Sequence, residues 1–434
     1  MTRYFVLSCL IAIASFPVFA DATPEAPEFW IGQAERNGAV LPFQIRLVQG
    51  DKLTGALDVP GFFRLGLPLA QSEKKGDKLT LGFGMTQFNH MLEGKMKGDR
   101  YEGIWHWINE NIECRFTLEK KLDPRPYTVE EVTFANEDVT LGGTVFTPKT
   151  PGPHPAIVMV DGSGDAVRWF REGHADFFAR RGMVTLIYDK RGCGKSTGNW
   201  RMVDFGPLAK DALAGLHLLQ KRPAVDPKRC GFWGISQAGW VMPLAASIAP
   251  QDVAFIVTAS GATVNVKDEG KYDYLERLRD AGYKGDDLVL ADKILELDYQ
   301  VTMTGQGYDE LRKLTDEGRK KPWWKVFEFQ PVPPGARAFP KLIGAFDPRP
   351  ILDEIKTPIL WMYGLDDNSV EPSKSIAILN DIMSKQTKPW TIKTFPDADH
   401  GISIPRDPKA AFPYRPQAPG YWETMADWLK SQGD

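Results

Sequence analysis

Four runs of consecutive apolar residues, separated by segments of helical periodicity, constrain the fold of this chain most. The runs lie at 156–160, 184–188, 229–234 and 253–259, and the helical segments at 169–181, 205–221 and 237–248. A strand that is apolar on both faces needs cover on both, which parallel sheets obtain from their connecting helices. Further strands at 359–364 and 391–395 and a last helix at 420–429 extend the pattern. The sequence therefore predicts an α/β fold with a doubly wound sheet over residues 126–434.

A different pattern precedes this region, from about residue 28 to 122. Apolar residues alternate with polar ones, as in Leu41, Phe43, Ile45 and Leu47, and Gly-Asp turns recur at 50–51, 76–77 and 98–99. An apolar residue at every second position indicates strands with one buried face. Residues 21–125 are therefore expected to form a small antiparallel all-β domain, a meander or a barrel. The aromatic residues at 105–107 fit a core better than a carbohydrate platform.

The strand pattern is interrupted between about 262 and 350. This segment is charged and aromatic, with helical stretches at 272–281, 286–304 and 307–319. It cannot add parallel strands, so we expect a helical cap over the carboxyl ends of the strands, where doubly wound sheets place their sites. Such a cap would control pocket shape and water access. The alternative is a structural excursion that does not contact the pocket.

Residues 1–20 are expected to be a cleaved signal peptide. Arg3 precedes a mostly apolar stretch, and Ala20 ends it before Asp21. The stretch is short for a membrane span, and Pro17 interrupts it. A lipoprotein site at Cys9 is disfavoured because too little apolar sequence precedes it. We expect an exported protein, periplasmic or secreted, with no later segment that spans a bilayer.

Charge and cysteine content exclude several classes of function. The net charge is −3 without a basic run, which gives no reason to expect nucleic acid or an anionic membrane as partner. The three cysteines after the leader, Cys114, Cys193 and Cys230, are an odd number and do not form a disulfide framework. No His or Cys pair has the spacing of metal ligands. We therefore expect no metal and no cofactor.

The third apolar run ends in a strand-to-helix turn with a serine at its tip, Gly234-Ile235-Ser236-Gln237-Ala238. In a nucleophile elbow, such a turn lifts the hydroxyl above the sheet and aims backbone N–H groups at the same point. Ala238 stands where a second glycine is usual, and Gly239 follows it. The alternative is a serine that only caps the helix. Ser236 is the predicted nucleophile.

A serine hydroxyl needs a base, and the base needs an acid, in the chain order serine, acid, histidine on this architecture. Asp367 follows the strand at 359–364 with the usual G-x-x-D spacing, and Asp366 is the nearby alternative. His400 lies in the loop after the strand at 391–395. The other histidines, at 90, 106, 154, 174 and 217, all precede the elbow. The predicted triad is therefore Ser236, Asp367 and His400.

A glycine-containing turn, Asp161-Gly162-Ser163-Gly164, follows the first apolar run. In this architecture that turn supplies one N–H of the oxyanion hole, and the residue after the nucleophile supplies the other. The expected donors are the backbone N–H groups of Gln237 and Ser163. Position 161 is more often histidine in this fold. The alternative is an ordinary glycine turn.

The segment 189–196 resembles a phosphate-binding P-loop only superficially. The P-loop needs a glycine where Asp189 stands. The segment fits better as a loop after a sheet strand, with Asp189 and Arg191 expected to pair with each other.

Together, these features resemble the α/β-hydrolase superfamily, and within it exported bacterial serine esterases of the serine aminopeptidase and dienelactone-hydrolase-like branch. The likeness rests on Trp30-Ile31-Gly32, the loop 188–198 and the elbow. It implies an N-terminal β domain, a capped hydrolase domain and hydrolysis of carboxylic esters with short acyl groups. Ala238 and Asp161 depart from the family pattern.

The expected function is therefore that of an exported serine carboxylesterase acting on a small-molecule ester. A peptidase or aminopeptidase is one alternative, with Asp268, Glu269 and Glu276 of the cap as candidate anchors for a peptide terminus. Thioesterase, amidase and lactonase activities remain open, because the fold supports all of them. A binding protein with a degenerate hydrolase scaffold is the alternative from another class. The sequence leaves the oligomeric state open.

Overall fold

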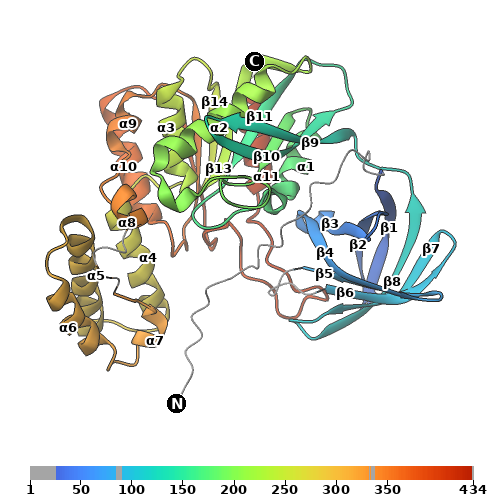
Figure 1. Cartoon of the computed structure of the whole chain (residues 1–434), viewed down its shortest axis with the longest axis horizontal. Coiled ribbons are helices and arrows are strands. Elements are labelled where there is room, and N and C mark those ends of the chain that lie inside the picture. Colours follow the sequence, from blue (N-terminus) through green and yellow to red (C-terminus); the bar gives the residue numbers. More distant parts are fainter. Residues whose placement is uncertain (1–25, 85–89, 332, 334–337, 433–434) are drawn as a thin grey trace.

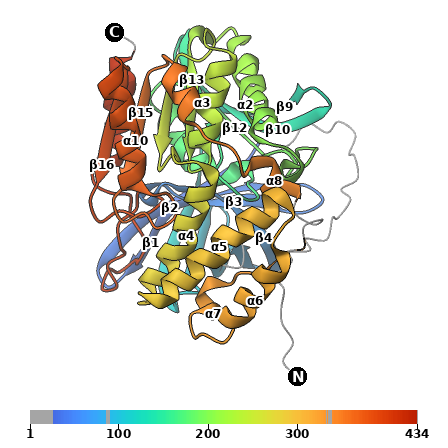
Figure 2. The ribbon, with the colours of Figure 1, turned by 90° about the vertical axis from the view of Figure 1, so that its left-hand side faces the viewer.

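The computed structural model describes residues 26–84, 90–331, 333 and 338–432. The expected leader, 1–20, lies outside the described residues. Figure 1 shows an α/β sheet with cap helices on one side and a barrel of strands on the other. Figure 2 gives the same arrangement from the side of the cap.

The N-terminal strands form a closed antiparallel barrel, which decides between the two expected forms. Each strand pairs with the next, and β1 closes the barrel by pairing with β8. Trp105 and Trp107 are only 0% and 4% exposed and lie in the barrel core, as expected. An eight-stranded barrel has an interior of the size that side chains fill. The strands are β1 (Glu28–Arg36), β2 (Ala39–Val48), β3 (Thr54–Val59), β4 (Arg64–Lys75), β5 (Lys78–Phe83), β6 (His90–Lys97), β7 (Arg100–Trp107) and β8 (Ile112–Lys121), with the short helix η1 (Pro60–Phe62) after β3.

The second sheet has eight strands in the order β16-β15-β14-β13-β11-β12-β10-β9. Its strands from β11 onward are parallel, whereas β10 is antiparallel to both β12 and β9. The sheet is therefore mixed, with an antiparallel hairpin at one edge. The strands are β9 (Tyr127–Asn136), β10 (Val139–Pro148), β11 (His154–Val160), β12 (Val184–Tyr188), β13 (Val225–Ile235), β14 (Phe255–Ala259), β15 (Ile359–Gly364) and β16 (Trp390–Phe395).

Helices cover both faces of this sheet, and the strand residues alternate between two cores. Ile157 and Met159 belong to the core under α1 and α11, whereas Val158 and Val160 belong to the core under α2 and α3. This alternation explains why the strands are apolar throughout. The elements are η2 (Arg168–Arg171), α1 (Glu172–Ala179), η3 (Trp200–Met202), α2 (Phe205–Gln220), α3 (Ala238–Ile248), α9 (Arg349–Glu354), α10 (Pro372–Lys385) and α11 (Tyr421–Ser431).

The cap is helical and has a core of its own, which includes Leu278, Ile294, Trp323 and Phe327. Its first helix also reaches the α/β sheet, because the Tyr272 hydroxyl donates to the backbone oxygen of Asp367 at 2.7 Å. The cap therefore contacts the loop that follows β15. Its helices are α4 (Val266–Asp280), α5 (Asp286–Thr304), α6 (Tyr308–Gly318), α7 (Trp324–Phe327) and α8 (Ala338–Ile343).

Several contacts among the described residues join the barrel to the α/β domain, and two of them come from charged or loop residues far apart in the chain. Arg46 of β2 donates to Asp58 at 2.8 Å and to Glu172 of α1 at 2.5 Å. The second contact comes from the 403–417 loop, which is closed at its base by the bridge between Ser403 and Gln417. Phe412 of this loop lies in the barrel core, 8% exposed.

Candidate active site

The elbow has the geometry that a nucleophile elbow requires. Ser236 stands between β13 and α3 with φ of 60°, a strained conformation for a residue that is not glycine. Its backbone oxygen accepts from Gly239 and Ala262 at 2.8 and 3.1 Å, which holds the turn in place.

Small residues allow this turn to form. A β-carbon on Gly234 would lie 2.5 Å from that of Ala238 and 2.8 Å from the Val160 oxygen, so only glycine fits. Ala238 is completely buried, and its methyl group occupies the space that Gly234 leaves open. The departure from G-x-S-x-G is therefore accommodated.

Asp367 and His400 are brought together across two loops. Asp367 Oδ2 lies 2.9 Å from His400 Nδ1, and Asp367 Oδ1 accepts from the N–H groups of Ser369 and Val370 at 2.8 and 2.9 Å. Asp367 is 2% exposed, whereas Asp366 is exposed to solvent. The carboxylate is therefore fixed in one orientation toward the imidazole, and the alternative Asp366 is not in this position.

The turn that carries His400 is shaped by its neighbour Asp399. Asp399 Oδ1 accepts from the N–H groups of Gly401 and Ser403 at 3.0 and 2.9 Å. The same turn passes over the end of β15, where a β-carbon on Gly364 would lie 2.3 Å from the Asp399 oxygen. Glycine at 364 therefore lets the acid loop and the base loop pack directly on each other.

The Ser236 hydroxyl has no hydrogen bond to any residue that the structure describes, His400 included. It faces the turn after β11, because a β-carbon on Gly162 would lie 3.6 Å from Ser236 Oγ. Hydrogen bonds between nucleophile and base are often long in unliganded hydrolases and shorten with substrate.

The N–H groups expected to form the oxyanion hole are available. Within the described part of the chain, neither the Gln237 nor the Ser163 backbone N–H has an acceptor. Asp161, the departure from the family pattern, accepts from Arg171 Nε at 2.6 Å. Its carboxylate is thereby held on a guanidinium, and the donors of the turn remain backbone groups.

The loop after β12 contains a residue whose position the sequence did not reveal. Lys190 is 6% exposed and donates to the Gly162 backbone oxygen and to Gln237 Oε1.

The expected ion pair between Asp189 and Arg191, in the same loop, is wrong. Asp189 binds Arg168 of η2 at 2.9 Å and Arg191 binds Asp211 of α2 at 2.7 Å, so each side chain has its partner on a different element.

The acidic residues of the cap are already engaged. Asp268 pairs with Lys374 at 3.1 Å, and Glu276 pairs with Arg279. Glu269 is 5% exposed, and its Oε1 accepts from the Glu371 N–H at 2.9 Å. Burial, together with the charges of Asp367 and Glu371, raises the pKa of Glu269 to about 8. None of the three candidate anchors for a peptide amine is a free carboxylate.

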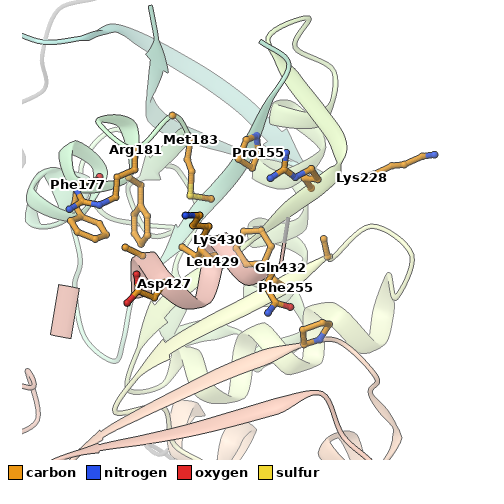
Figure 3. Close-up of a pocket in the computed structure, with 16 residues that line it drawn as sticks. Pro155, Phe177, Arg181, Met183, Lys228, Phe255, Asp427, Leu429, Lys430 and Gln432 are labelled. Carbon is orange, nitrogen blue, oxygen red and sulfur yellow. Dashed lines mark hydrogen bonds between the residues drawn. The ribbon is translucent and has the colours of Figure 1, made fainter. Parts of the chain in front are cut away.

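A cavity of about 730 Å³ lies away from these residues. Figure 3 shows its lining, which includes Phe177, Arg181, Met183, Phe255 and Lys430. Phe255 begins β14, so the cavity is at the amino ends of the parallel strands. Sites of doubly wound sheets lie at the carboxyl ends, where Ser236, Asp367 and His400 are found.

No group of three metal-binding side chains occurs among the described residues. In the same part of the chain, no helix has the length and apolar character needed to cross a bilayer. Cys114, Cys193 and Cys230 are buried free thiols, and burial raises the pKa of each.

Comparison with known proteins places this site in a family context. The sequence profile of the X-Pro dipeptidyl-peptidase (S15 family) matches residues 137–394. Polyketide transferase ATR5 of Stachybotrys chlorohalonatus is 31% identical over 134 residues, which are 30% of this chain and 44% of that protein. Thiohydrolase apmlB of Arthrinium phaeospermum is 33% identical over 138 residues, which are 31% of this chain and 44% of that protein. The chain thus matches less than half the length of these curated relatives.

Among solved structures, hypothetical protein PA2218 of Pseudomonas aeruginosa superimposes with a TM-score of 0.45 and 20% identity, over 72% of this chain and 95% of that one.

Proposed function

The chain belongs to the X-Pro dipeptidyl-peptidase (S15) family of α/β-hydrolases, and from that premise we propose that it is an exported serine hydrolase of short-acyl carboxylic esters. The observations that support this most are the hydrogen bond between the buried Asp367 carboxylate and His400, and the positive φ of Ser236 at the elbow. Export is proposed from the leader pattern of residues 1–20 alone.

In this proposal the Ser236 hydroxyl attacks the ester carbonyl while His400 accepts the hydroxyl proton. Asp367 accepts a hydrogen bond from His400 Nδ1, so Nε2 is left to accept the proton of the hydroxyl. The Asp367 carboxylate also stabilises the imidazolium that then forms. The N–H groups of Gln237 and Ser163 donate hydrogen bonds to the negatively charged oxygen of the tetrahedral intermediate. His400 then protonates the leaving alcohol, and water cleaves the acyl-enzyme by the same steps.

The state of the cap carboxylates favours esters over peptides. An aminopeptidase needs a free carboxylate to hold the substrate amine, and Asp268, Glu269 and Glu276 are all occupied or buried. Thioester hydrolysis is the second candidate. It is favoured by the similarity of this chain to a protein named as a thiohydrolase.

The first test is covalent labelling with a fluorophosphonate, followed by kinetics with p-nitrophenyl esters from acetate to octanoate. We expect the wild type to be labelled at Ser236 and to prefer the shorter esters. Ser236→Ala should lose labelling and turnover, at least about 10⁴-fold, with an unchanged melting temperature. Ser384→Ala, an exposed serine on α10, is the matched control and should behave as wild type.

Full ester turnover by Ser236→Ala contradicts the assignment. Faster cleavage of glycyl-prolyl anilides than of any ester would establish the peptidase alternative. Faster cleavage of acyl thioesters would establish the thioesterase alternative.

A further inference from the structure

Lys190 is a buried ammonium group that the proposed mechanism does not use. Its Nζ donates to the Gly162 oxygen at 2.8 Å, to Gln237 Oε1 at 3.0 Å and to the Gly164 oxygen at 3.4 Å. These three acceptors match its three N–H bonds. The Trp200 ring closes the remaining side, with its centroid 4.4 Å away.

No carboxylate forms an ion pair with Lys190 in the part of the chain that the structure describes. The two carboxylates whose charges act on Lys190 have other partners, since Asp161 binds Arg171, and Asp165 binds Trp200 and Arg201. Burial lowers the pKa of Lys190 to about 8, and the charge of Asp161 opposes this effect. A buried cation without an ion pair is costly to the folded state, which makes Lys190 a candidate for a functional role.

The contact with Gly162 orients one expected oxyanion donor. The Gly162 C=O and the Ser163 N–H belong to the same planar trans peptide and point in opposite directions. Lys190 binds the Gly162 carbonyl, so the Ser163 N–H on the other side of the peptide points away from Lys190. The peptide cannot rotate to turn this N–H toward Lys190 without breaking that hydrogen bond. A hydrogen bond from a cation to the carbonyl also polarises the peptide and makes that N–H a stronger donor.

The second contact reaches the side chain of the residue that carries the other expected donor. The Gln237 side chain is buried, at 3% exposed, and its Oε1 is bound by the same Nζ. The backbone N–H of Gln237 is the second expected donor. One ammonium group thus connects the two segments that supply the oxyanion hole, the turn after β11 and the elbow after β13.

We propose that Lys190 is a positioning residue that sets the geometry of the oxyanion hole. The inference rests on the proposed serine hydrolase function. It assigns to Lys190 an effect on the transition state and little effect on the binding of the ground-state ester, because the oxyanion exists only after attack.

The test compares Lys190→Met, of similar length and no charge, with Lys195→Met. Lys195 lies in the same loop, but its side chain is exposed and pairs with Glu131 at 3.0 Å. Removing one oxyanion donor costs ~10²–10³ in rate, so a displaced donor should lower kcat of Lys190→Met about 30-fold or more. KM should change less than about threefold. Affinity for a trifluoromethyl ketone analogue should fall in proportion to kcat/KM, whereas Lys195→Met should match wild type in all three.

Each other outcome is also decisive. Unchanged kcat in folded Lys190→Met, or a rise in KM alone, overturns the positioning role. If Lys190→Met does not fold, Lys190→Gln takes its place, because it retains a donor for the Gly162 oxygen. Its kcat should fall about tenfold while its KM changes less than about threefold. A wild type that a fluorophosphonate does not label contradicts the serine hydrolase itself, which separates that failure from failure of the Lys190 proposal.

Discussion

At the scale of single residues, burial separates two adjacent aspartates that sequence spacing alone distinguishes weakly. Asp367 is 2% exposed and hydrogen-bonded to His400, whereas Asp366 faces solvent. The spacing from the end of the strand favours Asp367, because the loop needs that length to turn its carboxylate back toward the base. Nothing in the local sequence shows that Lys190 lies under Gly162, since the contact joins loops after two different strands.

Asp367→Asn should therefore lower kcat ~10⁴-fold, because the amide favours the wrong imidazole tautomer. Asp366→Asn should stay within about threefold of wild type, as expected for an exposed position. Steady-state kinetics on the best p-nitrophenyl ester, with circular dichroism as the folding control, measures both. A larger loss in Asp366→Asn would exchange the two roles.

At the scale of elements, periodicity predicts most strands and helices of the α/β domain, but not their directions. Nothing in the sequence of residues 139–148 shows that β10 runs antiparallel to β12, since strand direction depends on pairing with residues distant in the chain. The cap helix α4 begins at Val266, earlier than the expected 272. Asn265 caps it by accepting from the Asp268 N–H at 2.9 Å, a local signal that the apolar periodicity did not include.

The same helix carries a titratable contact to the acid loop. Glu269 accepts from the Glu371 N–H, and its pKa is raised to about 8 by burial and by Asp367 and Glu371, while Lys374 opposes this. The ordinary value is 4.5, so between pH 4.5 and 8 the folded chain binds more protons at this group than the unfolded chain does. The contribution of Glu269 to stability therefore falls as pH rises through this window.

Glu269→Gln should remove this dependence. Urea unfolding at pH 5 and pH 8 should show a smaller loss of stability on raising the pH in Glu269→Gln than in wild type. The exposed Glu317→Gln, on α6, is the control and should retain the wild-type dependence. An equal pH dependence in wild type and Glu269→Gln would refute a raised pKa at this position.

At the scale of the whole molecule, the sequence predicts two structural units but not the contacts between them. Arg46 and Glu172 are far apart in the chain, and nothing in the sequence distinguishes them from charged residues exposed on the surface. In the fold, Arg46 serves two carboxylates, Asp58 at 1% side-chain exposure and Glu172 at 19%. Removal of the guanidinium leaves both without their shared cation at the junction of barrel and α/β domain.

Arg46→Met should therefore destabilise the protein by about 3–5 kcal/mol, the usual effect of breaking a buried ion pair. Lys120→Met, which removes the exposed pair with Glu28 on the barrel surface, should leave the stability close to that of the wild type. Urea denaturation followed by tryptophan fluorescence measures both. Equal stabilities of the two variants would show that the ion pairs of Arg46 with Asp58 and Glu172 do not stabilise the junction between the barrel and the α/β domain.

Phe412 has a consequence for how the chain is made. The barrel strands are synthesised before the ring that packs against Trp107, with centroids 5.8 Å apart, because Phe412 follows all strands of the α/β sheet in the chain. Until then the end of the barrel beside Trp107 lacks its last apolar neighbour. The barrel thus completes its interior only after the strands of the α/β sheet have been synthesised, so a nascent chain stalled before residue 412 would hold an unfinished barrel.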